Sequence, residues 1–193
     1  FELHYQPIHD ADGGVHSLEA LLRWQHPERG LVAPDVFMQS AERSGLIVPI
    51  GAWVLRTVCS QLRAWHDAGA VDVKVAVNLS ARQFRDPDLV GLVMGTLAEF
   101  DLDPSCLALE LTESSIMQQP ERARATLDEL RRNGLRIAVD DFGTGYSSLS
   151  YLKRLPIHAL KIDRSFMTDL PDNRESGAIV SAIVTMSRAL GLT

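Results

Sequence analysis

The stretch that decides the fold runs from Leu107 to Phe142 and reads LALELTESSIMQQPERARATLDELRRNGLRIAVDDF. It opens with LALELTE, a short and mostly apolar run that is typical of a strand covered on both faces. The segment PERARATLDELRRNG then carries proline at its start and glycine at its end, as helices often do. RIAVDDF is a second apolar run. Strand, helix and strand in this order predict a right-handed parallel βαβ unit.

The same alternation continues on both sides of this unit. Upstream, residues 73–80 (VKVAVNLS) predict a strand and residues 86–100 (DPDLVGLVMGTLAEF) a helix. Downstream, the pattern predicts a helix, a strand and a helix over residues 146–155, 158–163 and 173–190. Strands that alternate with helices indicate an α/β fold built on a parallel sheet.

The first quarter of the chain has a different pattern. Residues 1–8 and 15–24 predict two strands, and the short DADGG turn between them makes the strands antiparallel neighbours. Residues 34–45 and 48–69 follow as two helices. The prediction therefore contains six strands, whereas a closed parallel barrel needs about eight. We expect a TIM-like (β/α)8 barrel that lacks its last two strands in this sequence; a complete open sheet is the alternative.

Composition limits the classes of protein that this sequence can represent. The 193 residues suit one domain, and a hydrophobic content of 46% is enough for a substantial core. A net charge of −6 argues against polymeric nucleic acid as a partner. Cys59 and Cys106 have no zinc or disulfide spacing, so we expect a reducing, cytoplasmic setting. We also expect no membrane segment, because no apolar run approaches about 20 residues.

Polar side chains occur where the predicted strands end. Asn78, Glu110, the pair Asp140–Asp141 and Lys161 each follow an apolar run, and Glu19 stands inside the apolar run LEALL. In parallel α/β folds the carboxyl ends of the strands meet at one edge, where active sites form. Each residue alone is compatible with a helix cap or a solvated turn. Together they predict one polar cluster.

The donor types in this cluster indicate a metal site. Carboxylate and amide oxygens without histidine or thiolate suit hard cations such as Mg²⁺ or Mn²⁺. Two such cations would remove the repulsion between the neighbouring carboxylates of Asp140 and Asp141. Other chemistries lack their motifs, because the sequence has neither the GxSxG of serine hydrolases nor the HExxH of zinc proteases.

The motifs together resemble the EAL family of cyclic di-GMP phosphodiesterases. The tripeptide Glu19-Ala20-Leu21 stands within EALLRW, and NLS, ELTES, DDFGTGYSSL and LKIDRSF follow in the order and spacing of that family. The resemblance spans residues 1–193 and implies a barrel whose first strand is antiparallel to the others. It also implies an EAL domain that is incomplete at its C-terminal side and excised from a larger multidomain protein, which can be anchored in a membrane elsewhere.

The resemblance implies a role for each matching position. Glu19, Asn78, Glu110 and Asp140 resemble the ligands of one metal ion, and Asp141 resembles a ligand of the second. Lys161, with Glu19, resembles the catalytic group that holds the attacking water. Gln6 and Arg23 resemble contacts to the substrate, and Glu113 resembles the anchor of the loop after the aspartate pair. Residues 142–154 resemble the segment through which the family forms homodimers.

The implied reaction is the metal-dependent hydrolysis of one phosphodiester bond of cyclic di-GMP, which yields the linear dinucleotide pGpG. Two alternatives stay open at this point. One is a receptor or scaffold that binds cyclic di-GMP without cleaving it, and the other is a barrel phosphoesterase with a different substrate.

Overall fold

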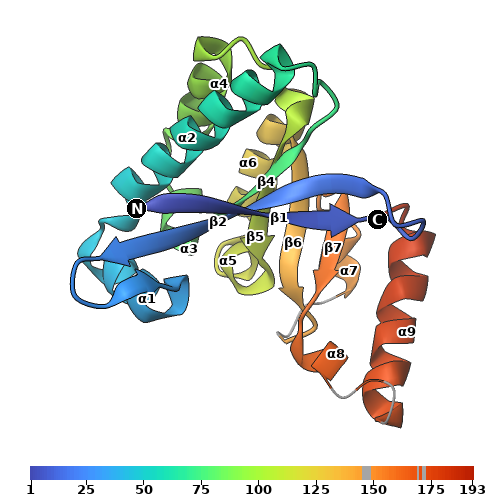
Figure 1. Cartoon of the computed structure of the whole chain (residues 1–193). Helices are drawn as coiled ribbons and strands as arrows, with labels where there is room; N and C mark the ends of the chain where they lie inside the picture. The colour runs from blue at the N-terminus through green and yellow to red at the C-terminus, as the bar shows by residue number, and fades with distance from the viewer. Residues whose placement is uncertain (145–148, 169, 171–172) are drawn as a thin grey trace.

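A computed structural model describes residues 1–144, 149–168, 170 and 173–193. Its centre is a curled sheet in the order β1-β2-β4-β5-β6-β7, with β3 paired to the outer part of β2 (Figure 1). The first pair of strands is antiparallel, and β2, β4, β5, β6 and β7 run parallel to one another. The strand bounds are β1 (Glu2–His9), β2 (Val15–His26), β3 (Gly30–Val32), β4 (Val75–Leu79), β5 (Leu107–Thr112), β6 (Arg136–Phe142) and β7 (Ala159–Ile162).

Helices cover the convex face of the sheet. The longer ones are α1 (Pro34–Ser44), α2 (Ile47–Asp67), α4 (Leu89–Glu99), α6 (Pro120–Arg132) and α9 (Arg174–Ala189). Short helical turns follow several strands or precede β5, namely α3 (Ala81–Phe84), η1 (Pro104–Cys106), α5 (Glu113–Met117), α7 (Leu149–Leu152) and α8 (Ser165–Thr168). In Figure 1, α9 lies beside β7 at the edge of the sheet that is farthest from α1.

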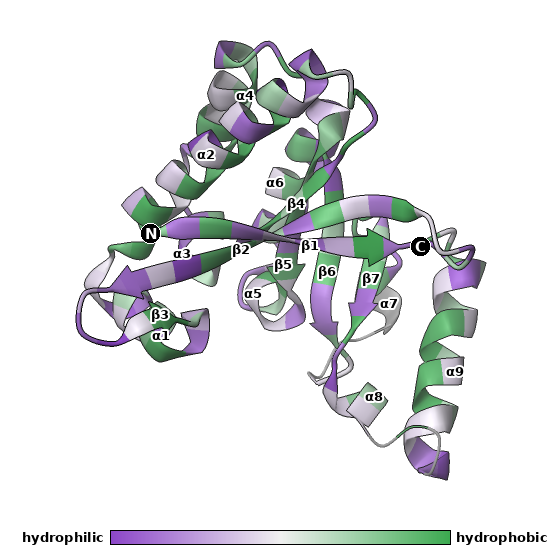
Figure 2. Cartoon of the chain, viewed as in Figure 1, coloured by the Kyte–Doolittle hydropathy of each residue, from purple (hydrophilic) through white to green (hydrophobic). Residues whose placement is uncertain are grey.

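Side-chain alternation along the strands separates the core from the concave face. On β5, Leu107, Leu109 and Leu111 are fully buried, and Leu109 lines a space between the sheet and helices α2 and α4. Ala108 and Glu110 point the other way, into the hollow of the curled sheet. The core therefore lies between sheet and helices, as the apolar runs predicted. Figure 2 shows that both hydrophobic and hydrophilic residues occur along the strands and the long helices.

The sequence-based elements are confirmed within these residues, with several additions. The six predicted strands are present, and β3 and the one-turn helices α3, α5 and α8 were not predicted. The helix expected over residues 146–155 comprises Leu149–Leu152, and residues 146–148 lie outside the described residues. The curl of the sheet and the antiparallel first strand agree with the predicted barrel.

The last residue returns to the sheet at β7. The amide of Thr193 donates to the carbonyl of His158, and the amide of Leu160 donates to the carbonyl of Thr193, each at 3.0 Å. This is the hydrogen-bonding pattern of a parallel strand pair. Cys59 and Cys106 are buried free thiols. Among the described helices, none combines the length and apolar character that crossing a bilayer requires.

Candidate active site

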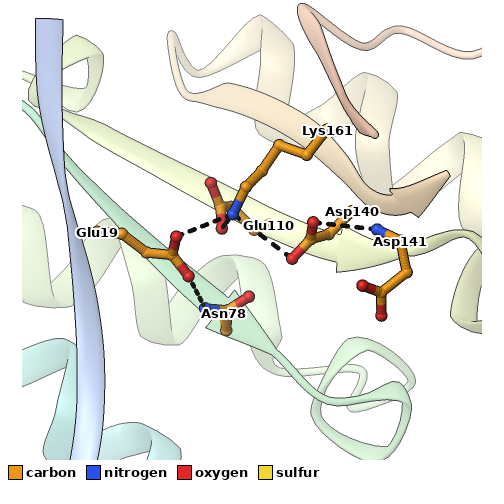
Figure 3. Close-up of polar contacts among 6 residues, drawn as sticks. All are labelled: Glu19, Asn78, Glu110, Asp140, Asp141 and Lys161. Carbon is orange, nitrogen blue, oxygen red and sulfur yellow. Dashed lines mark hydrogen bonds and ion pairs between the residues drawn. The ribbon is translucent and has the colours of Figure 1, made fainter. Parts of the chain in front are cut away.

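The parallel strands bring the predicted polar residues to one end of the concave face. In the sheet register Asn78 of β4 stands beside Glu110 of β5, and Asp140 of β6 stands beside Thr112. Glu19 reaches the same place from β2, and Lys161 reaches it from β7 (Figure 3). Five strands thus contribute to one cluster, as the sequence predicted.

The ammonium group of Lys161 lies at the centre of this cluster. Its Nζ is 2.9 Å from Oε2 of Glu19, 2.6 Å from Oε2 of Glu110 and 3.5 Å from Oδ2 of Asp140. These residues are 142, 51 and 21 positions from Lys161 in the chain, so only the tertiary fold brings them together. Three carboxylates that would repel one another therefore converge on a single cation (Figure 3).

Asn78 joins the cluster through the second oxygen of Glu19. Its Nδ2 donates to Oε1 of Glu19 at 2.8 Å. Both oxygens of Glu19 are thus bonded, one to an amide and one to the Lys161 ammonium. A carboxylate held on both oxygens has a fixed orientation, and the amide oxygen of Asn78 stays available as a ligand.

The Asp140–Asp141 pair lies at an irregularity in the sheet. The pairing of β6 with β7 shifts register between Val139 and Phe142, so both aspartates fall within a bulge. Asp141 has a φ of 54°, in the left-handed region that aspartate tolerates better than most residues. Its amide donates to Oδ1 of Asp140 at 3.0 Å, and its carboxylate lies on the far side of Asp140 from Lys161 (Figure 3). The bulge therefore turns two neighbouring carboxylates in different directions.

Burial and charge shift the pKa values of the central groups. Glu110 is 3% exposed, and burial raises its pKa to about 7 although the Lys161 ammonium opposes that shift. Burial also acts to lower the pKa of Lys161, but the carboxylates of Glu110 and Asp140 outweigh it and raise that pKa. Lys161 is therefore charged at neutral pH, and Glu110 takes up a proton more readily than an exposed glutamate does.

A third aspartate lies beside the pair. The pKa of Asp141 is raised by burial and by the negative charges of Asp140 and Asp163. Asp163, two residues after Lys161, accepts a 2.8 Å hydrogen bond from the amide of Ser165, which lowers its own pKa. The mouth of the site is thus strongly acidic, with Lys161 as its nearest cation.

Two predicted substrate contacts lie on the antiparallel hairpin. Gln6 of β1 is the register partner of Glu19 and has an exposed side chain. Arg23 is four residues beyond Glu19 on β2, so the two side chains share a face of the strand. Its Nη1 donates to the carbonyl of Leu22 at 2.9 Å, and the described residues include no bond between Arg23 and the carboxylate cluster.

Glu113 contacts the start of the loop that follows the aspartate pair. It is 4% exposed, and its Oε2 accepts a 3.0 Å hydrogen bond from the amide of Gly143. Gly143 has a φ of 102°, and a Cβ there would lie 2.9 Å from the ring of Phe166. The position of the loop start therefore depends on a buried carboxylate and on the absence of a side chain.

A cavity of about 280 Å³ extends along the concave face from the cluster. One end is lined by Glu19, Glu110 and Lys161, and the other by Lys74, Arg136 and His158. Small residues on neighbouring strands form its wall between the two ends: Ala76, Ala108 and Ala138.

The donor set fits a hard divalent cation. The side chains supply carboxylate and amide oxygens, and three of the carboxylates already surround a positive charge. In the present arrangement, however, no three of the described His, Cys, Asp or Glu side chains have the mutual spacing of a metal site.

The family model of the EAL domain matches residues 1–193, which is the whole chain. The chain belongs to the EAL domain family. This EAL domain is 50% identical over 191 residues to MucR of Pseudomonas aeruginosa, a bifunctional diguanylate cyclase/cyclic di-GMP phosphodiesterase. The aligned residues cover 98% of this chain and 28% of MucR. It is 46% identical over 192 residues to the cyclic di-GMP phosphodiesterase NbdA of the same organism, and this alignment covers 99% of the chain and 24% of NbdA.

A solved structure of the MucR phosphodiesterase in complex with cyclic di-GMP superimposes with a TM-score of 0.95 at 49% identity. The match covers 99% of this EAL domain and 78% of that chain. The domain thus spans about a quarter of the length of the curated relatives described above.

Sequence reasoning missed the hydroxyl groups that cap the one-turn helices next to the site. Ser80 caps α3 and forms a reciprocal capping box with Gln83, and Thr112 caps α5. The signal for the first was present, because Ser followed three residues later by Gln is the pattern of a capping box.

Proposed function

We propose that this EAL domain hydrolyses cyclic di-GMP to linear pGpG with the help of divalent cations. The observation that carries the proposal is the convergence of three carboxylates, those of Glu19, Glu110 and Asp140, on Lys161. Asn78 joins them through its bond to Glu19. The family assignment and the names of the relatives MucR and NbdA, which are cyclic di-GMP phosphodiesterases, support it.

In this proposal Mg²⁺ or Mn²⁺ is bound by the side-chain oxygen atoms of five residues: Glu19, Asn78, Glu110, Asp140 and Asp141. Cations bound there would offset the charge of a substrate phosphate and lower the pKa of a coordinated water. We assign Asp141 to a second cation, and the position of its carboxylate on the far side of Asp140 from Lys161 supports this assignment. Burial, followed by the charges of neighbouring carboxylates, raises the pKa values of Glu110 and Asp141, and a bound cation would oppose both shifts.

The residues of the chain itself position the reactants. Lys161 carries a permanent charge at the centre of the cluster, so it can orient the attacking water and stabilise charge on the phosphate oxygens. Water attacks the phosphorus, the bond from phosphorus to the 3′ oxygen breaks, and the 3′ oxygen receives a proton. Arg23 and Gln6, on the hairpin beside Glu19, contact a substrate phosphate and the rest of the ligand in this proposal.

A further assignment concerns the assembly. We propose a homodimer formed through residues 142–154. Residues 145–148 of that segment lie outside the described residues, so this proposal rests on the family resemblance and is testable by sedimentation velocity.

The direct test is hydrolysis by the protein with Mn²⁺ or Mg²⁺, with pGpG detected by chromatography. Glu19→Gln and Asp140→Asn should each reduce the rate by roughly 100-fold, because each removes a charged donor from the site. Glu129→Gln, which alters an exposed carboxylate on α6, is the control and should retain the rate. Unchanged rates in both site variants would refute the metal assignment.

A receptor that binds cyclic di-GMP without cleaving it is the second candidate. The observation that favours it is the Lys161 ammonium, which already satisfies three carboxylates without any metal. Calorimetry in chelator followed by addition of Mn²⁺ separates the two functions. Tight binding in chelator with no pGpG released after Mn²⁺ addition would support the receptor.

A further inference from the structure

Asn78 occupies a weakly supported position in the sheet. The parallel pairing of β4 with β2 runs from Val75 to Val77 and ends there, so Asn78 has no register partner on the strand that carries Glu19. On the other side Asn78 pairs with Glu110 of β5. The bond from Asn78 Nδ2 to Glu19 therefore extends past the last backbone contact between their strands.

A capping box begins two residues after Asn78. The Oγ of Ser80 accepts from the amide of Gln83 at 3.3 Å, and Oε1 of Gln83 accepts from the amide of Ser80 at 3.1 Å and from its hydroxyl at 2.8 Å. The carbonyl of Ser80 accepts from the amide of Phe84 at 3.0 Å. Every polar group of Ser80 is thus bonded to the one-turn helix α3.

Helix α2 packs against the Gln83 side chain of the capping box. Gln83 is 8% exposed, and a Cβ on Gly51 of α2 would lie 1.7 Å from its Nε2 and 2.7 Å from its Cδ. A side chain at Gly51 would displace the Gln83 amide, and Gln83 cannot move without losing its bonds to Ser80. The glycine is required here because of this close approach, and not because of its φ angle.

The same arrangement recurs at two other strands of the site. Thr112 stands two residues after Glu110 and accepts from the amide of Ser115 at 3.3 Å at the start of α5. Asp163 stands two residues after Lys161 and accepts from the amide of Ser165 at the start of α8. In each case a site residue is followed at the second position by a side chain that caps the next helical turn.

We propose that Ser80, Gln83 and Gly51 act together as positioning residues that hold the Asn78 amide against Glu19. This inference rests on the proposed function for its catalytic meaning. Because Asn78 is tethered on the β5 side only, the backbone that follows it sets the direction of its side chain, and the capping box immobilises that backbone. Residues that orient a metal ligand from outside the first coordination shell typically change metal affinity by roughly 10-fold or more.

The test uses the side-chain amide resonances of Asn78, recorded by NMR in metal-free buffer. In Ser80→Ala these resonances should move toward those of a solvated asparagine, and Mn²⁺ binding measured by calorimetry should weaken roughly 10-fold. Ser80→Thr keeps the hydroxyl and should restore both values. Unchanged Asn78 resonances in Ser80→Ala would overturn the proposal.

A matched control lies at the opposite end of the same sheet. Asp103 accepts a 2.8 Å capping bond from the amide of Ser105 just before β5, away from the site. Asp103→Ala removes a bond of the same kind and should leave the Asn78 resonances and Mn²⁺ affinity unchanged. A change as large as that in Ser80→Ala would show a general effect of lost caps and would overturn the positioning role.

A double-mutant cycle tests the part played by Gly51. Gly51→Ala should shift the Asn78 resonances, and Gln83→Ala should do the same because it removes the capping box. If Gly51 acts through Gln83, the double variant should match Gln83→Ala alone. Additive shifts would contradict this link.

The NMR measurement also separates this proposal from the proposed function, because it needs neither metal nor substrate. Resonances that respond as expected in a protein without hydrolytic activity would uphold the positioning role and refute the phosphodiesterase assignment. Hydrolysis by a protein whose Asn78 resonances do not respond to Ser80→Ala would uphold the phosphodiesterase assignment and refute the positioning role.

Discussion

Lys161 illustrates at the residue scale how the site tolerates its own charge. Three carboxylates lie within 3.5 Å of the Lys161 ammonium group, and the Lys161 side chain as a whole is 29% exposed. Breaking a buried charge pair leaves the partner without compensation, which costs more than the pair contributes. Lys161 therefore acts on stability as well as on the proposed chemistry, and the two effects can be measured separately.

We predict that Lys161→Met lowers the rate of cyclic di-GMP hydrolysis by roughly 100-fold and the free energy of unfolding by roughly 3 kcal/mol. Mn²⁺ should then stabilise the variant more than the wild type, because the cation replaces the missing charge. Urea unfolding with and without Mn²⁺ measures this. Arg132→Met, at an exposed arginine at the end of α6, is the control. Equal stabilisation of Lys161→Met and wild type by Mn²⁺ would contradict the prediction.

We expect His158, at the other end of the cavity, to make the stability of the fold depend on pH. Burial and the nearby charges of Arg131 and Arg136 lower its pKa, and its Nδ1 accepts from the amide of Ile137 at 3.0 Å. The folded state thus favours the neutral ring, whereas the unfolded chain takes up a proton below about pH 6.5. The stability that His158 contributes is therefore present above that pH and is lost as the pH falls through the depressed pKa.

The variant His158→Asn keeps an acceptor but does not titrate. We expect the urea midpoint of the wild type to fall more steeply between pH 7.5 and pH 5 than that of the variant. Parallel declines in the two proteins would show that another group is responsible.

At the element scale, the junction between β6 and α8 depends on one glycine. Gly143 and Gly134 both have φ angles near +100°, at 102° and 92°. A Cβ at Gly143 would meet the Phe166 ring at 2.9 Å, whereas one at Gly134 would meet Pro104 at 3.5 Å, an ordinary contact. A residue with a Cβ would therefore be strained in its backbone at both positions, but only at Gly143 would the Cβ also lack space.

Both Gly143→Ala and Gly134→Ala should lower the free energy of unfolding by about 1–2 kcal/mol through backbone strain. Only Gly143→Ala should also reduce hydrolysis, because it moves the loop start that Glu113 holds. Thermal unfolding and steady-state rates measure the two effects. Equal rates in the two variants would argue against a role of that contact in activity.

At the scale of the whole molecule, the negative charge of the chain bears on the proposed binding of cyclic di-GMP. The chain carries a net charge of −6, and the mouth of the site contains five acidic side chains: Glu19, Glu110, Asp140, Asp141 and Asp163. A phosphodiester approaches this mouth against repulsion unless cations are bound. The enzyme and receptor candidates therefore differ in their dependence on metal.

We predict that removing divalent cations with a chelator weakens binding of cyclic di-GMP at least 10-fold, or about 1.4 kcal/mol. Calorimetry with Glu19→Gln in Mn²⁺ and in chelator provides the matched comparison, since that variant should lose most of the difference. Equal affinity of the wild type in both buffers would favour the receptor.

The sequence predicted most of the site because its residues end regular strands. Asn78, Glu110, Asp140 and Lys161 were placed from apolar runs alone, and the shared edge of a parallel sheet implied that they meet. The bulge at Asp140–Asp141 was beyond such reasoning, because a bulge depends on the pairing partner β7. The spacing of Ser80 and Gln83 was sufficient to predict a capping box. The close approach of Gln83 to Gly51 could not be predicted, because it depends on how α2 packs in the tertiary structure.

The sequence by itself determined the order of the strands and helices, the antiparallel start and the oxygen-rich donor set. These follow from side-chain periodicity, turn composition and residue type, which are local properties of the chain. The tertiary structure alone decided that the Lys161 ammonium lies among three carboxylates and that Asp141 points away from it. Those distances depend on sheet register and curl, which arise from contacts between residues as far as 142 positions apart.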